Sequence, residues 1–364
     1  MFAFYRDSRP RRDALARPAG APDRYLLFGL DELAERGIRV GHNLERAAEA
    51  PAWARIAAAG LQAGVRRMGG YGGDFTRVLP SLRRANRADV VFSTVDTVGI
   101  PLLALAALGT VRPPMVYVSI GLLPRLAALE DRRIVAAYAR VLRDATAVVA
   151  YGAREAEELQ SWLGGGRVVF CPFGVDTEHF RPSTAPAEVD VLSVGADPRR
   201  DFEQLVQVAT RNKDLSFQIV ASADHARTLG GLPANVRLET DIPFDAMRAR
   251  LGAARVVALP VRENAYSGAT TTLLQAMACG KPVVVSRTAA IAQGYGLEDS
   301  HNVRMVPPGD AAAFEQALLD LLGDPERAAA LGARARETVE RRLSWRRYVD
   351  ALHDLLTEGA KGAR

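Results

Sequence analysis

The residues best suited to chemistry lie between 258 and 286, in the segment ALPVRENAYSGATTTLLQAMACGKPVVVS. An apolar run ending at Leu259 predicts a strand, and residues 267–272, SGATTT, predict the start of a short helix. Gly268 lets a phosphate approach the backbone closely, and the small residues after it leave the first N–H groups of the helix accessible. With the threonine hydroxyls as further donors, this helix start is predicted to bind phosphate.

A second polar residue follows on the same helix. Gln275 lies four positions after Thr271, one turn and roughly 6 Å along the same face. Its amide could hydrogen-bond a ribose while the helix start holds a diphosphate. A glycine before a threonine-rich helix start is also common as a simple cap, so nucleotide binding and capping both stay open at this point.

Short apolar runs alternate with helical patterns almost throughout, which is typical of an α/β fold with parallel sheets covered by helices. We expect a first set of strands at residues 2–5, 38–40, 89–93, 115–118, 147–150 and 168–170, with helices at 24–36, 75–85, 132–143 and 154–163. A second set of strands is expected at 189–194, 216–220, 236–238, 256–259, 282–286 and 303–306. The Pro-, Gly- and Ser-rich segment 173–188 predicts a linker between two domains. Ligands bind such folds at the strand-to-helix turns.

Four sequence segments resemble the motifs of one family and occur in the same order as in that family. QAMACGKPVVVS, preceded by YSGATTTLL, resembles the donor-site signature of the retaining glycosyltransferases of family 4. PFGVDTEHFRP resembles the family's interdomain element, VLSVGADPRRDFEQL the opening of its nucleotide domain, and LSWRRYVDALHDLL its last helix. The resemblance covers most of the chain and implies the GT-B fold, with two Rossmann-like domains facing across a cleft. It implies an acceptor-side domain over 1–175, a nucleotide-sugar domain over 176–340 and a helix over 341–364 that packs back on the first domain.

This chain departs from the family at both of its usual donor-site glutamates. Ser267 stands where the first glutamate faces the donor sugar, and Gln275 stands where the second holds the ribose hydroxyls. Glutamine can still form those hydrogen bonds without the charge. Ser267 is shorter and neutral, so the sugar's identity does not carry over from the resemblance. Glu263 and Asn264 are candidates for the missing polar group, with ordinary surface loop residues as the alternative.

The resemblance also implies which residues meet the donor phosphates. Arg200 stands where the family has a lysine, whereas Ala196 stands at the usual arginine position. Arginine matches phosphate oxygens with two donors at once. Base contacts are expected around residues 240–243. The expected donor-binding residues are Arg199, Arg200, Asn264, Ser267, Gly268, Ala269, Thr270, Thr271 and Gln275, with Arg200, Ser267 and Asp96 in catalytic roles.

The acceptor side is expected in the first domain. Ser119 occupies the place of the family's strand-end histidine, after an apolar strand. Asp74 follows the glycine-rich MGGYGG, and Asp96 lies in STVDT beyond a predicted strand. Both carboxylates are at loops that can face a cleft. Each is expected either to orient an acceptor hydroxyl or to cap a helix.

The resemblance predicts a hexosyltransferase that moves a sugar from a nucleotide-diphosphate sugar to an acceptor hydroxyl with retained anomeric configuration. The acceptor is expected to be a sugar, a lipid or a small molecule. No cofactor and no metal are expected, because the helix dipole and arginine would neutralise the leaving phosphates. A uridine diphosphate sugar is the first choice of co-substrate. The alternatives are a degenerate nucleotide-sugar-binding or partner subunit and a nucleotide-sugar epimerase of the same architecture.

Composition and the positions of apolar, charged and cysteine residues predict the general class of the protein. The chain has 364 residues, 48% of them hydrophobic and 24% charged, which suits a globular protein of two domains. The longest apolar run, 98–111, is too short to span a membrane. Apolar residues precede the first arginines, the reverse of a signal peptide, so a cytoplasmic protein is expected. Cys171 and Cys279 lie in apolar neighbourhoods without metal-type spacing, so neither a disulfide nor a zinc site is expected.

The net charge of +5 comes mainly from the first half of the chain. Part of it lies in PAWARIAAAGLQAGVRRM, where Trp53, Ile56 and Leu61 alternate with arginines. Such a helix could rest on the anionic inner face of a membrane. The alternative is the solvated face of a core helix. Nucleic acid is not an expected partner, because no stacking aromatic residues accompany the arginines.

Overall fold

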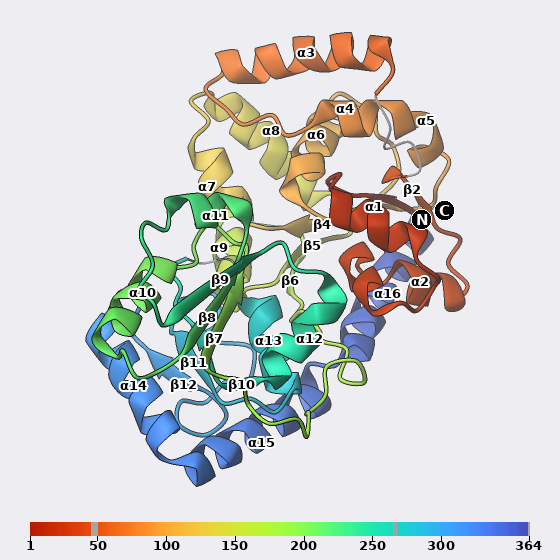
Figure 1. Cartoon of the computed structure of the whole chain (residues 1–364). Coiled ribbons are helices and arrows are strands. Elements are labelled where there is room, and N and C mark those ends of the chain that lie inside the picture. The colour runs from red at the N-terminus through yellow and green to blue at the C-terminus, as the bar shows by residue number, and fades with distance from the viewer. Residues whose placement is uncertain (45–49, 265, 267, 363–364) are drawn as a thin grey trace. The chain divides into compact units, whose positions relative to one another are not determined.

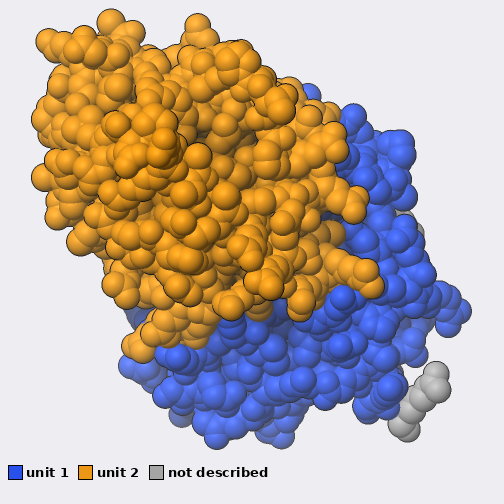
Figure 2. Space-filling model, turned by 90° about the horizontal axis from the view of Figure 1, so that it is seen from below, with its two compact units in different colours: residues 1–151, 155–171, 349–364 blue, residues 152–154, 172–348 orange. Residues whose placement is uncertain are grey.

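The computed structural model of the chain describes residues 1–44, 50–264, 266 and 268–362. The chain divides into two compact units, coloured separately in Figure 2. The first unit comprises residues 1–151, 155–171 and 349–364, and the second comprises 152–154 and 172–348. Each unit contains a six-stranded sheet with helices packed on it (Figure 1).

The sheet of the first unit has the strand order β2-β1-β3-β4-β5-β6, and every pairing in it is parallel. Its strands are β1 Phe2–Phe4, β2 Gly41–His42, β3 Val91–Ser93, β4 Met115–Ser119, β5 Ala147–Ala150 and β6 Val168–Phe170. All residues of β1, β3, β4 and β5 are buried. Helices on both faces explain why these strands are continuous apolar runs rather than alternating ones.

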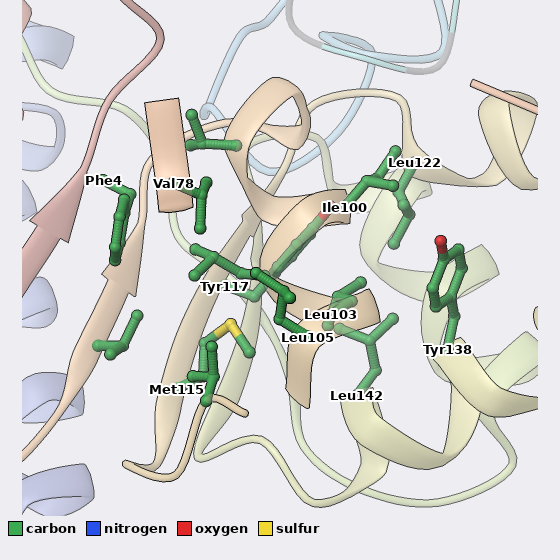
Figure 3. Close-up of a cluster of buried hydrophobic side chains, with 14 of the residues drawn as sticks. Phe4, Val78, Ile100, Leu103, Leu105, Met115, Tyr117, Leu122, Tyr138 and Leu142 are labelled. Atoms are coloured by element: carbon green, nitrogen blue, oxygen red, sulfur yellow. The ribbon is translucent and has the colours of Figure 1, made fainter. Parts of the chain in front are cut away.

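The helices of the first unit provide the rest of its core. They are α1 Arg9–Ala16, the 3-10 helix η1 Pro22–Leu27, α2 Leu30–Glu35, α3 Ala52–Arg67, α4 Phe75–Val78, the 3-10 helix η3 Leu79–Ser81, α5 Leu82–Ala85, α6 Asp96–Ala107, α7 Leu122–Ala127, α8 Arg132–Arg143 and α9 Ala153–Leu163. Figure 3 shows side chains from several of these helices and from β4 in one buried cluster, including Val78, Leu103, Tyr117 and Leu142.

The structure corrects three expected elements of this unit. The helix expected at 24–36 is two pieces, because Phe28 and Gly29 have φ angles of 55° and 82° that no right-handed helix contains. The strand expected at 38–40 lies at Gly41–His42 instead. The helix expected at 75–85 is present as α4, η3 and α5, with the 3-10 turn at the proline in its middle.

The sheet of the second unit has the order β12-β11-β10-β7-β8-β9 and is also parallel throughout. Its strands are β7 Val189–Gly195, β8 Phe217–Ala221, β9 Val236–Thr240, β10 Ala254–Leu259, β11 Val283–Ser286 and β12 Arg304–Val306. Its helices are α10 Phe202–Arg211, α11 Ala223–Thr228, α12 Phe244–Gly252, α13 Thr270–Ala278, α14 Ala311–Gly323 and α15 Pro325–Arg342.

The last helix, α16 Trp345–Gly362, starts in the second unit and belongs to the first from Val349 onward. Within the first unit, Asp350 pairs with Arg36 at 2.8 Å and Glu358 pairs with Arg167. In the described part of the chain, no helix combines the length and the apolar character needed to cross a membrane.

Candidate functional site

Two strand-to-helix loops of the second unit are joined by backbone hydrogen bonds. The N–H of Asp201 donates to the carbonyl oxygen of Pro260 at 2.9 Å, and the N–H of Arg262 donates to that of Arg199 at 2.8 Å. Arg200 and Val261 form an antiparallel bridge between these bonds. The loop from β7 to α10 therefore lies against the loop from β10 to α13. Two motifs about 60 residues apart in sequence meet at the carboxyl edge of one sheet, where ligands bind in such folds.

The guanidinium group of Arg200 lies inside the first of these loops. The residue is only 2% exposed, and its Nη2 donates to Ser193 Oγ at 3.2 Å and to the carbonyl oxygen of Val194 at 2.7 Å. Among the described residues, Nε and Nη1 have no hydrogen-bond partner. Burial lowers the pKa of Arg200 to about 10, which leaves it charged at neutral pH. The structure therefore keeps a positive charge with unused donors beneath the loop, whereas Arg199 beside it is exposed.

Gly195 is required for this arrangement. A Cβ atom on Gly195 would stand 2.5 Å from Arg200 Nε, closer than real side chains allow. The ring of Phe202 supports the guanidinium from another side, with its centroid 5.5 Å from the Arg200 Cζ. The glycine that ends β7 thus makes room for the buried charge.

Asp197, which was not among the predicted site residues, faces the second loop. Its carboxylate accepts a hydrogen bond from the N–H of Arg199 at 2.8 Å and one from the hydroxyl of Tyr266 at 3.4 Å. A Cβ atom on Gly268 would stand 2.9 Å from Asp197 Oδ1. Burial raises the pKa of Asp197, while the Arg199 N–H and the charge of Arg200 act in the opposite direction. A carboxylate therefore lies beside the glycine that was expected to admit phosphate.

The start of α13 has no side-chain cap. Ala269 occupies the capping position without a side-chain hydrogen bond, and the first turn holds no acidic residue. The hydroxyl of Thr270 is buried without a partner among the described residues. Because the first N–H groups of a helix have no partner within the helix, this start offers several donors.

The other predicted donor residues lie on this helix or on the loop that precedes it. Thr271 is half-buried, and Gln275 is buried one turn later on the same helix. Asn264 is buried too, and its amide nitrogen donates to the carbonyl oxygen of Arg262 at 2.8 Å. Its Oδ1 has no partner in the described structure. Ser267, for which donor binding and catalysis were predicted, lies outside the described residues.

On the first unit, two buried carboxylates hold the loop after β4. Asp96 accepts hydrogen bonds from the hydroxyl of Tyr117 at 2.7 Å and the N–H of Ile120 at 3.0 Å. Glu155 accepts from the hydroxyl of Ser119 at 2.7 Å and the N–H of Gly121 at 2.8 Å. Each carboxylate therefore holds one side chain and one backbone N–H group of the same strand end.

The burial of these carboxylates changes their acidity. Desolvation raises the pKa of Asp96 to about 6 and that of Glu155 to about 7, against the effect of their hydrogen bonds. Asp96 and Ser119 are both 0% exposed. Their geometry supports a role in shaping the loop, and direct contact with an acceptor stays a prediction.

Asp74 caps α4, which is one of the two roles expected for it. Its carboxylate accepts a hydrogen bond from the N–H of Thr76 at 3.0 Å. Glu155 was missed because it lies in the glutamate-rich helix AREAEELQ, where its burial leaves no distinct sequence signal. Asp197 had a weak signal, an acid in the short loop after a strand and directly before Pro198.

The second unit contains a match to a known protein family. Residues 188–324 match the family described as "Glycosyl transferases group 1". This segment runs from β7 to the end of α14 and includes both joined loops. The match therefore covers the whole of the site built above in the second unit.

Curated relatives are similar in sequence to part of the chain. A Corynebacterium glutamicum protein named GDP-mannose-dependent monoacylated alpha-(1-6)-phosphatidylinositol monomannoside mannosyltransferase is 29% identical over 51% of this chain and 55% of its own. The D-inositol 3-phosphate glycosyltransferase of Saccharomonospora viridis is 35% identical over 52% of this chain and 50% of its own. The chain spans about half the length of the curated relatives it matches.

Solved structures resemble the chain over nearly its whole length. Sucrose-phosphate synthase from Thermosynechococcus elongatus has a TM-score of 0.74 at 18% identity, covering 98% of each chain. Anabaena HepE, solved in complex with UDP, has a TM-score of 0.66 at 16% identity, covering 98% of this chain and 99% of its own. This likeness shows that the chain has the GT-B fold, as predicted.

Proposed function

We propose that this protein is a glycosyltransferase of the group 1 type, which transfers a hexose from a nucleotide-diphosphate sugar to an acceptor hydroxyl. One observation carries the proposal. The uncapped start of α13 lies against a loop that contains a buried arginine with unused donors, inside the segment that matches the glycosyl transferase family. An anion such as a diphosphate is the ligand that suits such donors.

The proposed chemistry depends mainly on the leaving group. As the bond between sugar and phosphate breaks, negative charge grows on the diphosphate. The helix start and the charge of Arg200 would stabilise that charge, and electrostatic stabilisation of this kind often contributes most to the rate enhancement. We propose that no metal is needed for this step. Gln275 would hydrogen-bond the ribose, since it lies one turn along α13 from Thr271.

The resemblance to family 4 supports retention of the anomeric configuration. In that mechanism the acceptor hydroxyl reaches the sugar on the face that the diphosphate leaves. Its proton passes to the departing phosphate oxygen, so no strong protein base is required. Asp96 would then act as a positioning residue, because its oxygens hold Tyr117 and Ile120.

A donor panel tests the proposal. Purified protein is incubated with labelled GDP-, UDP-, ADP- and TDP-sugars, and both hydrolysis and transfer are followed. GDP-mannose and UDP-glucose come first, because relatives named for GDP-mannose and structures solved with UDP-glucose resemble this chain. We expect turnover of at least one donor, undiminished by EDTA, with a product of unchanged anomeric configuration. Binding of donors without turnover would favour a degenerate binding subunit, and an epimerised donor would favour an epimerase.

A further inference from the structure

Helix α3 shows the reverse of the usual division between buried and exposed side chains. Its buried residues are small or of moderate size, Ala54, Ala58 and Val65. Two of its three large apolar side chains face solvent instead, with Trp53 57% and Ile56 75% exposed, whereas Leu61 packs against the core. Figure 1 shows α3 along the outer edge of the first unit, beyond α4, α6 and α8. Trp53 and Ile56 therefore contribute nothing to the core of the unit.

The exposed apolar residues are concentrated in this region. Five large hydrophobic side chains are exposed in the described part of the chain, namely Trp53, Ile56, Tyr71, Leu108 and Leu319. Three of the five lie on α3 or on the glycine-rich loop that follows it. A concentration of this kind marks an interaction surface, whereas single exposed apolar residues need no explanation.

The charge of the same segment has one sign. Arg55, Arg66 and Arg67 are exposed, and the sequence from Pro51 to Gly73 contains no acidic residue. The salt bridges found among the described residues do not involve these three arginines. Glu130 packs against Gly69, just beyond the end of the helix. The segment therefore carries positive charge near both ends of the helix and no negative charge of its own.

We infer that α3 and the loop 69–73 form a docking surface for an anionic lipid bilayer. Tryptophan and isoleucine side chains insert at the boundary between headgroups and acyl chains, and arginines bind the lipid phosphates. A second copy of this chain is a less suitable occupant. In a two-fold dimer α3 would face α3, and the arginines of each copy would oppose those of the other.

The docking surface is connected to the loop held by Asp96. The ring of Tyr71 lies under the Arg125 guanidinium at 4.6 Å, and the Tyr71 hydroxyl donates to Thr97 Oγ1 at 3.4 Å. Arg125 in turn pairs with Asp96 at 3.7 Å. A bilayer bound at α3 would thus lie near the proposed acceptor side of the first unit. That the acceptor is a lipid rests on the proposed function, whereas docking itself does not.

Vesicle flotation of the full chain tests docking without any donor present. Vesicles of phosphatidylcholine alone are compared with vesicles that also contain phosphatidylglycerol, at low and high salt. We expect co-flotation with the anionic vesicles only, weakened by salt. The double variant W53A/I56A should lower the bound fraction by roughly tenfold, because it removes the inserted apolar area. The triple variant R55Q/R66Q/R67Q should remove the preference for anionic vesicles.

Leu108 provides a matched control, since it is 71% exposed and lies outside the docking surface. L108A should float like the parent protein, and circular dichroism confirms that each variant is folded. Equal flotation of W53A/I56A and L108A would overturn the inference. Failure of the parent to bind anionic vesicles would overturn it as well. If light scattering then showed a dimer that W53A/I56A abolishes, the surface would be assigned to a second copy. If the protein floats with anionic vesicles but turns over no donor in the panel, docking stands and only the proposal of a lipid acceptor fails.

Discussion

The carboxylate of Asp197 lies so close to Gly268 that a Cβ atom at position 268 would be 2.9 Å from its Oδ1. The two residues come from different loops of the second unit, one before α10 and one before α13. A negative charge therefore borders the helix start at which we propose that a diphosphate binds. This relationship makes the proposed site testable with single substitutions.

Removing the charge of Asp197 should strengthen diphosphate binding. D197N keeps the side chain's shape and its acceptor oxygen but eliminates repulsion of the phosphates. We expect the Kd of GDP or UDP to fall by roughly three- to tenfold at neutral pH, which is the scale of a charge interaction near a protein surface. Calorimetric titration measures it, with the free nucleosides as the control that should not change. Weaker diphosphate binding by D197N would mean that Asp197 supports the site instead of opposing the ligand.

Arg200 should matter for stability as well as for binding. R200A removes two hydrogen bonds to Ser193 and Val194 in a buried place, so the free energy of unfolding should fall by about 2–4 kcal/mol. It should also weaken diphosphate binding far more than nucleoside binding. Denaturant titration and calorimetry test both effects. R199A is the matched control, because Arg199 is exposed and its loss should leave stability within about 0.5 kcal/mol. Equal losses for diphosphate and nucleoside would remove Arg200 from the phosphate site.

Glu155 should make stability depend on pH. Burial raises its pKa from 4.5 to about 7, so between these values the folded protein holds a proton that the unfolded chain has released. Its contribution to the free energy of unfolding therefore falls as the pH rises from about 4.5 to about 7. Above that pH the contribution no longer changes. The full effect is on the order of 3 kcal/mol.

E155Q isolates this contribution, because it keeps an acceptor for Ser119 and Gly121 but does not ionise. The difference in unfolding free energy between E155Q and the parent should grow in favour of E155Q across that pH range. Denaturant titrations at a series of pH values measure it, with the exposed Glu157 replaced in E157Q as the control. Parallel pH profiles for parent and E155Q would show that Glu155 is not the source.

Two glycine substitutions should have opposite effects. A Cβ on Gly99 would stand 2.3 Å from the Tyr117 ring and 2.7 Å from Ser93 Oγ, so G99A should lower the free energy of unfolding by about 1–3 kcal/mol. Gly60 on α3 has nothing within 4 Å of an added Cβ. G60A should therefore raise stability by up to about 1 kcal/mol, through better helix propensity. Thermal unfolding compares the two, and a stabilising G99A would contradict the close packing of α6 on β4.

Sequence patterns predict the buried strands well, because helices on both faces require continuous apolar runs. The strand expected at 147–150 and the helix expected at 132–143 have those bounds in the structure. The break at Phe28 and Gly29 was not predicted, since the apolar pattern continues through it. A left-handed backbone at a phenylalanine depends on tertiary contacts that no local pattern records.

The candidate site, like the fold, was predicted from the sequence only in part. The helix start after Gly268 was predicted from glycine and small polar residues, which act locally. The burial of Arg200 and the approach of Asp197 to Gly268 were not, because they depend on the pairing of two loops about 60 residues apart. Glu155 was missed for a similar reason, since its two partners lie more than 30 residues earlier, one at the end of β4 and one just after it.

A crystal structure of the full chain with GDP or UDP tests the proposed diphosphate site most directly. We expect both phosphates within hydrogen-bond distance of the backbone N–H groups at 269–271, with the ribose near Gln275. Phosphates bound elsewhere on the molecule, with the start of α13 covered by the protein's own side chains, would contradict it.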